Sequence, residues 1–172
     1  MKKYLLGLAL ALTAAGSMAV DGYKNVKFGS SFEILKSAKL CDFQKASKQS
    51  GHKKMVMYNC LDFQFDGNQT IAAASFIDDE FGKLQIMVNS PIESVLGALY
   101  KKYGSPSSSS TEDEIQQAII TGHPIYIRFD NDTVNVKIER VNKIDLVSLI
   151  YTSPEFDKKM SETQASNISD DI

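Results

Sequence analysis

The sequence predicts an α+β fold in which two tandem helix-strand-strand-strand repeats form an antiparallel sheet with the helices on one face. Two helix-start signals, Ser30-Ser31-Phe32-Glu33 and Ser90-Pro91-Ile92-Glu93, lie 60 residues apart. Each is followed by three apolar or alternating segments that are separated by turn-forming residues. Of the 172 residues, 43% are apolar and 23% are charged, which suffices for one globular core.

The first 19 residues are typical of a cleavable export signal. Lys2 and Lys3 precede an apolar run over residues 4–15, and Ser17-Met18-Ala19 supplies small residues at the cleavage positions. The run is too short for a membrane anchor, which needs about 20 residues. We therefore predict cleavage after Ala19, a mature chain that begins at Val20, a periplasmic location and no stable membrane insertion after cleavage.

The mature chain is predicted to be a single domain over residues 20–152, with repeats at about 30–89 and 90–151. In the first repeat we expect a helix over 31–38 and strands over 55–65, 71–77 and 84–88, with turns at Asp66-Gly67 and 79–82. Leu61, Phe63 and Phe65 should share one face of the first strand. Ser30 is the expected N-cap of the helix.

In the second repeat we expect a better helix over 91–103, because its apolar residues recur every three or four positions. Ser90 should cap it and Gly104 should end it. Strands follow over 125–129, 134–139 and 144–151, with turns at 131–132 and 142–143. Helix followed by three strands thus occurs twice, which favours an internal duplication.

Two segments are predicted to lack regular structure. Residues 105–114 are a polar, serine-rich stretch. Residues 153–172 are rich in acidic side chains and poor in apolar ones, so we expect a disordered acidic tail. The alternative for the tail is a docking segment.

Cys41 and Cys60 both remain after cleavage, and an even pair of cysteines in an oxidising compartment favours a disulfide bond. A redox pair or a metal site is the alternative, but redox pairs usually read C-x-x-C and no second ligand pair lies nearby. The enclosed loop is polar and rich in lysine. A disulfide would therefore stabilise a segment that has little core of its own.

The search for chemistry predicts no catalytic, cofactor-binding or metal-binding residues, and hence no cofactor and no enzymatic activity. The formal charge of −2 and the pI of about 5.7 argue against nucleic acid as a partner. The acidic run Asp78-Asp79-Glu80 lacks the spacing of a calcium loop and is interpreted as a solvated turn. Of the two histidines, His52 lies in the lysine-rich loop. A small hydrolase with His123 as its base stays open, because a catalytic triad can assemble in space.

Four aromatic residues near strand ends, Tyr58, Tyr126, Phe129 and Tyr151, are candidates for a binding surface, since aromatic side chains are enriched at interfaces. Packing within the sheet is the alternative.

The segment Val26-Lys27-Phe28-Gly29-Ser30, the two cysteines and the run Lys101-Lys102-Tyr103-Gly104-Ser105-Pro106 carry a resemblance. With these features the chain resembles a loosely defined group of small exported, functionally uncharacterised proteins of proteobacteria and their phages. At the level of the fold it resembles the helix-plus-meander repeats of the β-lactamase inhibitory protein. A disulfide-linked antiparallel scaffold without catalytic motifs favours a non-enzymatic periplasmic binding or inhibitor module, for which a periplasmic or envelope protein is the expected class of partner. A phage-derived envelope protein that affects superinfection is the alternative.

Overall fold

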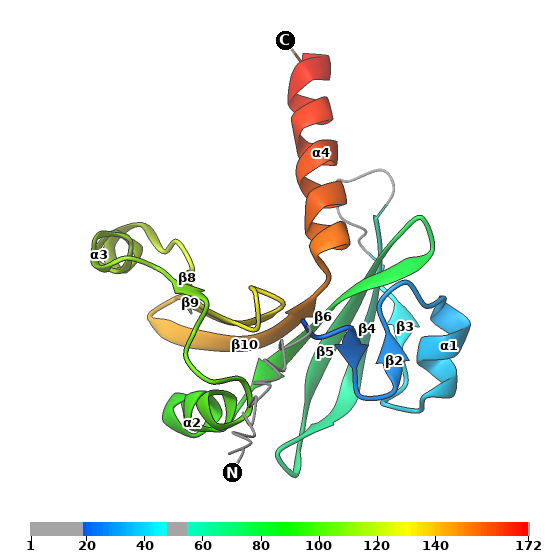
Figure 1. Ribbon diagram of the computed structural model, residues 1–172, viewed down its shortest axis with the longest axis horizontal. Helices are drawn as coiled ribbons and strands as arrows, with labels where there is room; N and C mark the ends of the chain where they lie inside the picture. The colour runs from blue at the N-terminus through cyan, green and yellow to red at the C-terminus, as the bar shows by residue number, and fades with distance from the viewer. Residues whose placement is uncertain (1–18, 48–54, 172) are drawn as a thin grey trace, which may run out of the picture.

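The structure is a computed structural model that describes residues 19–47 and 55–171 (Figure 1). It is an α+β fold built on an eight-stranded antiparallel sheet of strand order β3-β4-β5-β6-β10-β9-β8-β7, together with a two-stranded hairpin, β1-β2. Residues 1–18 of the predicted export signal and His52 lie outside the described residues.

The strands of the main sheet are β3 Gln44–Lys45, β4 Met55–Phe65, β5 Asn68–Ile77, β6 Glu80–Val88, β7 Ser108–Ser109, β8 Ile125–Phe129, β9 Val134–Val141 and β10 Ile144–Thr152. The hairpin consists of β1 Gly22–Tyr23 and β2 Val26–Lys27, and the helices are α1 Phe32–Ser37, α2 Ile92–Tyr103, α3 Glu112–Thr121 and α4 Pro154–Asp171. The strands predicted at 55–65 and 125–129 are confirmed with their bounds.

The two halves of the chain meet where β6 pairs with β10, from Val88 opposite Val147 to Lys83 opposite Thr152. On either side of this pair the strands follow one another as a meander. The second half differs because α3 lies between β7 and β8. The internal duplication itself stays a prediction.

One face of the sheet, the inner face, carries the hydrophobic core. Alternate residues of the central strands are fully buried there, including Ala74, Leu84, Ile86 and Val136. Helices α1 and α2 and the β1-β2 hairpin cover this face with the buried side chains of Leu35, Val95, Leu99, Tyr23 and Val26. The predicted placement of these two helices on one face agrees with the structure.

Tight turns set the register of the meander. Asp66 and Gly67, and likewise Asn142 and Lys143, adopt positive φ, as two-residue hairpin turns require. Both turns were predicted. The turn predicted at 79–82 lies instead at Asp78-Asp79, because β6 already begins at Glu80.

The predicted starts of both helices are wrong by one residue. The N-caps are Ser31 and Pro91, and neither makes a side-chain capping hydrogen bond. The Ser90 hydroxyl instead donates to Asp66 Oδ2 at 2.7 Å, which ties the start of α2 to the β4-β5 turn. Gly104, at φ 79°, ends α2 as expected.

Leu61 does not share a face with Phe63. A register shift between Cys60 and Phe63 rotates the strand, so that Leu61 is 69% exposed while Phe63 is 1% exposed.

The serine-rich stretch is ordered, contrary to the prediction. Ser108 and Ser109 form the edge strand β7, and the hydroxyls of Ser107 and Ser108 donate to Asp132 Oδ1 at 2.6 and 2.9 Å. Thr111 and Glu114 then form a capping box that starts α3.

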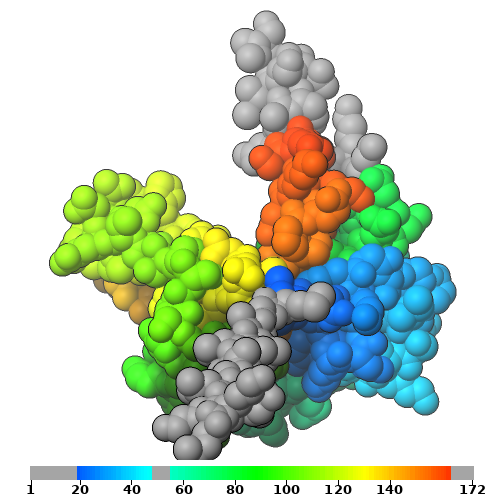
Figure 2. Space-filling view, in the orientation of Figure 1, coloured from blue at the N-terminus to red at the C-terminus, as the bar shows by residue number. Residues whose placement is uncertain are grey.

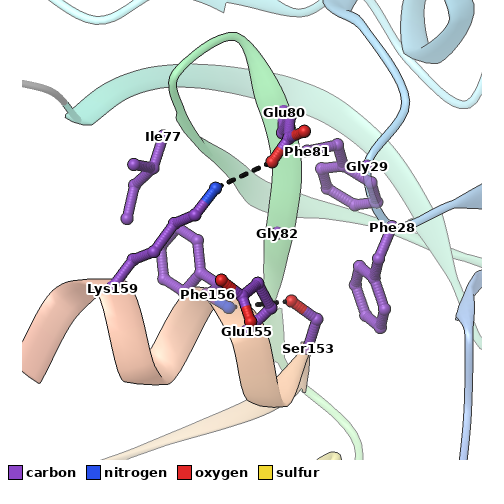
Figure 3. Close-up of a pocket in the computed structure, with 10 residues that line it drawn as sticks. All are labelled: Phe28, Gly29, Ile77, Glu80, Phe81, Gly82, Ser153, Glu155, Phe156 and Lys159. Carbon is purple, nitrogen blue, oxygen red and sulfur yellow. Dashed lines mark hydrogen bonds and ion pairs between the residues drawn. The ribbon is translucent and has the colours of Figure 1, made fainter.

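The tail prediction also needs correction, because residues 154–171 form α4. Its anchor is Phe156, which is 5% exposed and packs directly on Gly82 (Figure 3). Lys159 reaches over the β5-β6 turn and pairs with Glu80 at 2.8 Å. One aromatic residue on a glycine thus orders the start of a helix whose composition alone indicates disorder.

The disulfide between Cys41 and Cys60 is confirmed, with a Cα–Cα distance of 6.2 Å. It joins the segment after α1 to the middle of β4. A disulfide of this kind is typical of an oxidising compartment. Within the described residues, no helix is long and apolar enough to cross a membrane.

Candidate functional site

The face of the sheet opposite the core forms a polar cavity of about 250 Å³, which we call the outer groove. It opens where Figure 2 shows a hollow between the lobe that carries α3 and the start of α4. The side chains that line it come from β6, β8, β9, β10 and α4: Lys83, Gln85, Tyr126, Arg128, Asn135, Lys137, Ile150, Thr152 and Asp157.

Strand alternation places these residues together. Gln85 and Asn135 both pair with Ile150, and Arg128 pairs with Asn135 on the next strand. Their sequence neighbours on the same strands point into the core, so that the polar side chains must point the other way. Gln85 Nε2 donates to the Ser148 hydroxyl at 3.0 Å, which fixes the floor of the groove.

Three cations face the outer groove. Lys137 is paired with Glu139 at 2.8 Å, and the Arg128 guanidinium lies 4.7 Å from the centroid of the Tyr126 ring. In the part of the chain that the structure describes, no carboxylate lies within ion-pair distance of Lys83 or Arg128. Burial lowers the pKa of Lys83, and the charge of Lys137 lowers it further, while Asp157 acts in the opposite direction.

Asp157 supplies the carboxylate at the α4 side of the groove. Burial raises its pKa, and this effect is opposed by the Thr152 hydroxyl, which donates to Oδ1 at 2.9 Å, and by the charges of Lys83 and Arg128. The electrostatic character of the groove therefore depends on both the sheet and the helix.

Asn135 is 8% exposed, and its Oδ1 has no hydrogen-bond partner among the described residues. A buried polar atom without a partner costs about 1–3 kcal/mol. Such an atom in a cavity wall points to a ligand that carries a hydrogen-bond donor.

A second cavity of about 340 Å³ adjoins the outer groove at Tyr126 and Arg128 and contains His123. His123 is exposed, and its ring makes no hydrogen bond within the described chain. The nearby carboxylate of Glu114 accepts the Thr111 N–H at 2.8 Å, and the Ser110 hydroxyl accepts the Tyr126 N–H at 3.2 Å. These groups serve the local backbone, and the geometry gives the hydrolase alternative no support.

The four aromatic residues predicted as a binding surface do not lie together. Phe129 is fully buried in the core, and Tyr151 packs on Tyr23 at 4.9 Å. Tyr58 stacks on Phe32 of α1 at 3.8 Å on the same inner face. Only Tyr126, among these four, lines the outer groove. For the other three, the alternative of packing on the sheet describes the structure.

Sequence reasoning missed Lys83, Arg128, Asn135 and Lys137. All four residues alternate with apolar neighbours along their strands, but this alternation alone does not distinguish a binding surface from an ordinary polar face of a sheet. The pairing of β6 with β10, which brings the two halves together, was the missing information.

The described residues contain one group with the geometry of a metal site, formed by Cys41, Cys60 and Asp62. Both sulfurs belong to the disulfide and so cannot act as thiolate ligands. Asp62 accepts the Asp42 N–H at 3.1 Å and thereby holds the loop beside the disulfide.

Comparisons with known proteins cover almost the whole chain. A family described as "Uncharacterised protein" matches residues 23–171. An uncharacterised protein of Haemophilus influenzae is 32% identical over 174 residues, which is 99% of this chain and 98% of that protein. An uncharacterised protein of Pasteurella multocida is 26% identical over 165 residues, which is 83% of this chain and 84% of the relative. No solved structure matches, so that the likeness to the β-lactamase inhibitory protein stays an expectation. The chain therefore belongs to this family of uncharacterised proteins.

Proposed function

We propose that the protein is a non-enzymatic binding module of the periplasm, and that its outer groove binds an oxyanion that carries an adjacent hydrogen-bond donor. One observation carries the proposal: the same cavity contains the cation of Lys83 and the buried acceptor of Asn135, and among the described residues neither has an ion-pair or hydrogen-bond partner.

The charge balance of the groove favours an anion. Lys83, Arg128 and Lys137 contribute three positive charges, against the carboxylates of Asp157 and Glu139. This surplus is local, because the chain as a whole carries a formal charge of −2. An oxyanion that contacts Lys83 and Arg128 would replace water in a partly enclosed cavity, where charge-assisted hydrogen bonds are strong.

The donor requirement narrows the ligand class. Asn135 Oδ1 accepts hydrogen bonds, whereas a plain carboxylate or a fully ionised phosphate offers none. A hydroxy acid, or a peptide carboxylate with its own N–H nearby, would satisfy both parts of the groove. The acid can be a free small molecule or belong to a protein of the envelope.

A matched pair of small acids tests this proposal. Lactate and propionate have similar size, but lactate alone carries a hydroxyl next to its carboxylate. We expect lactate to shift the amide resonances around Lys83 and Asn135 in two-dimensional NMR spectra at lower concentration than propionate does. Inorganic phosphate in a parallel titration separates phosphate ligands from carboxylate ligands.

Three variants sharpen the test. Lys83→Met should weaken lactate binding about tenfold, since a hydrogen bond to a charged group is lost. Lys101→Met, on the exposed surface of α2, is the matched control and should leave it unchanged. Asn135→Ala should remove the preference for lactate over propionate. The proposal is wrong if neither acid nor phosphate shifts the resonances of the groove, or if Lys101→Met weakens binding as much as Lys83→Met.

Whether the acid belongs to a macromolecule is decided with immobilised mature protein and a periplasmic extract. A component that the native protein retains, but the Lys83→Met protein does not, would place the acidic group on an envelope partner. The periplasmic location is supported by the export signal predicted for residues 1–19 and by the disulfide.

A further inference from the structure

The backbone nitrogen of Val20 donates a hydrogen bond to Asp130 Oδ2 at 2.6 Å, across 110 positions of the sequence. Asp130 lies in the turn between β8 and β9, in the second half of the chain. Both residues are partly buried, and Val20 packs against the core. This contact joins the start of the described chain to the far half of the sheet.

The same nitrogen is the one that the predicted export cleavage would release. Cleavage after Ala19 hydrolyses the bond between the Ala19 carbonyl carbon and the Val20 nitrogen. The hydroxyl of water goes to Ala19, and the Val20 amine takes up protons to become an α-ammonium group. The catalyst is a signal peptidase, and water is the co-reactant.

We propose that export processing converts the Val20–Asp130 hydrogen bond into an ion pair that locks the N-terminal hairpin onto the β8-β9 turn. This inference rests on the export that we propose above, but it does not depend on the ligand of the outer groove.

The turn is built to hold the carboxylate in place. Asp130, Asn131 and Asp132 all adopt positive φ, so that the chain reverses sharply after β8. The hydroxyl of Thr133, which is 1% exposed, donates to the Asp130 carbonyl oxygen at 2.7 Å and to Oδ2 at 3.2 Å. Asp130 Oδ2 thus receives donors from Thr133 and Val20 in a partly buried position, where an ion pair is screened less than on an open surface.

The residues that follow Val20 form the β1-β2 hairpin, which the ion pair would stabilise. Tyr23 of β1 packs on Tyr151 at 4.9 Å and on Phe63 at 5.9 Å, which are residues of different halves. The β1-β2 hairpin has only two paired positions, so that its own ladder is weak. An ion pair at its first residue would hold the hairpin over the inner face.

The experiment compares N-termini. One form is released from a cleavable carrier so that Val20 is its first residue, and a second form retains Ala19. The extension leaves the N–H donor in place but moves the charge by one residue. We expect the Val20 form to melt about 3 °C higher than the extended form. A shift of this order is expected when a domain of this length gains one partly buried ion pair.

Substitutions in the turn supply the controls. Asp130→Asn should abolish the difference between the two forms, whereas Asp132→Asn, in the same turn, should preserve it. If Asp130→Asn fails to fold, acetylation of the Val20 form removes the charge without a substitution and should lower its melting temperature to that of the extended form.

Equal melting temperatures for the two native forms, or a difference that persists in Asp130→Asn, would overturn the ion pair. A mass of the exported protein that shows a first residue other than Val20 would overturn the processing step. Lactate titration of both forms reports on the groove separately, so that failure of one proposal is distinguishable from failure of the other.

Discussion

Lys83 lies at a position where binding and stability oppose each other. Its ammonium group is partly buried without an ion-pair partner in the described chain, and burial lowers its pKa from the ordinary 10.5. A group that is harder to protonate in the folded state than in the unfolded state destabilises the fold wherever it is charged.

We therefore expect Lys83→Met to raise the free energy of unfolding at neutral pH by about 1 kcal/mol, although it weakens ligand binding. The gain should shrink as the pH rises from the lowered pKa of Lys83 toward 10.5, because the native side chain loses its charge over this window. Urea unfolding of both proteins at several pH values measures the difference in the free energy of unfolding. Destabilisation by Lys83→Met would instead assign the lysine a structural role.

Gly82 is a second residue at which a side chain should disturb the packing of the protein. A Cβ atom at this position would overlap Phe156 Cδ2 and would lie 2.6 Å from Phe156 Cβ, so that α4 would have to move away from β6. We expect Gly82→Ala to destabilise the protein by about 1–3 kcal/mol and to expose α4 to hydrogen exchange. Gly97→Ala on α2 is the matched control, because its Cβ would meet no atom within 4 Å beyond the neighbouring backbone of its own helix. It should be neutral or stabilising, and equal losses in both variants would refute the role of Phe156 packing.

Single residues were predictable where a local rule decides their role. Asp66-Gly67 and Asn142-Lys143 were correct because a two-residue turn depends on the backbone freedom of those residues alone. The roles of Lys83 and Arg128 were not predictable, since these residues meet only after strands from both halves have paired.

At the scale of elements, the disulfide ties the short helix α1 to the sheet. We expect Cys41→Ser to destabilise the mature protein by roughly 2–4 kcal/mol, because the loop over 42–59 regains chain entropy in the unfolded state. Hydrogen exchange should show protection lost first in α1, which has only six residues, while α2 stays protected. Equal protection of α1 in the oxidised and reduced proteins would contradict this assignment.

Helix α4 contributes a carboxylate that competes with the proposed ligand. Asp157 acts on the charges of Lys83 and Arg128, and its own pKa is raised by burial. We expect Asp157→Asn to tighten lactate binding severalfold, since the amide keeps the hydrogen bond from Thr152 but lacks the negative charge.

The native protein should show the same effect with pH. Protonation of Asp157 removes the competing charge, and its raised pKa makes this happen at a higher pH than for an ordinary aspartate. Lactate affinity should thus rise as the pH falls through the Asp157 pKa, whereas Asp157→Asn should lack this rise. Isothermal titration at several pH values checks it, and identical pH profiles for the two proteins would contradict it.

The helices α3 and α4 differ in how far the sequence alone could predict them. Thr111 and Glu114 have the spacing of a capping box, which is a sequence signal for the start of α3. The serines before Thr111 nevertheless favoured a prediction without regular structure for this segment. The first turns of α4 rest on one apolar anchor, Phe156, and no periodic pattern reveals such a helix before Gly82 is known to lie beneath it.

At the scale of the whole molecule, the outer groove is composite. Lys83 and Gln85 come from the first half, Tyr126, Arg128, Asn135 and Lys137 from the second, and Asp157 from the C-terminal helix. The sequence predicted the meanders of both halves from local alternation. It could not predict that β6 pairs with β10, because that pairing joins residues 59 to 69 positions apart and leaves no local signature.

Because both halves of the chain line the groove, a bound ligand should stabilise both halves together. A ligand that binds only the folded protein at a hundred times its dissociation constant stabilises it by about 2.7 kcal/mol. Because the groove spans the β6-β10 pair, lactate should slow hydrogen exchange in β5 and β6 as well as in β8 and β9, measured residue by residue in NMR spectra. Lys83→Met removes the ligand contact of the first half, so any protection that remains in this variant should be confined to β8 and β9. Protection confined to β8 and β9 in the native protein would show that the ligand does not bridge the two halves of the sheet.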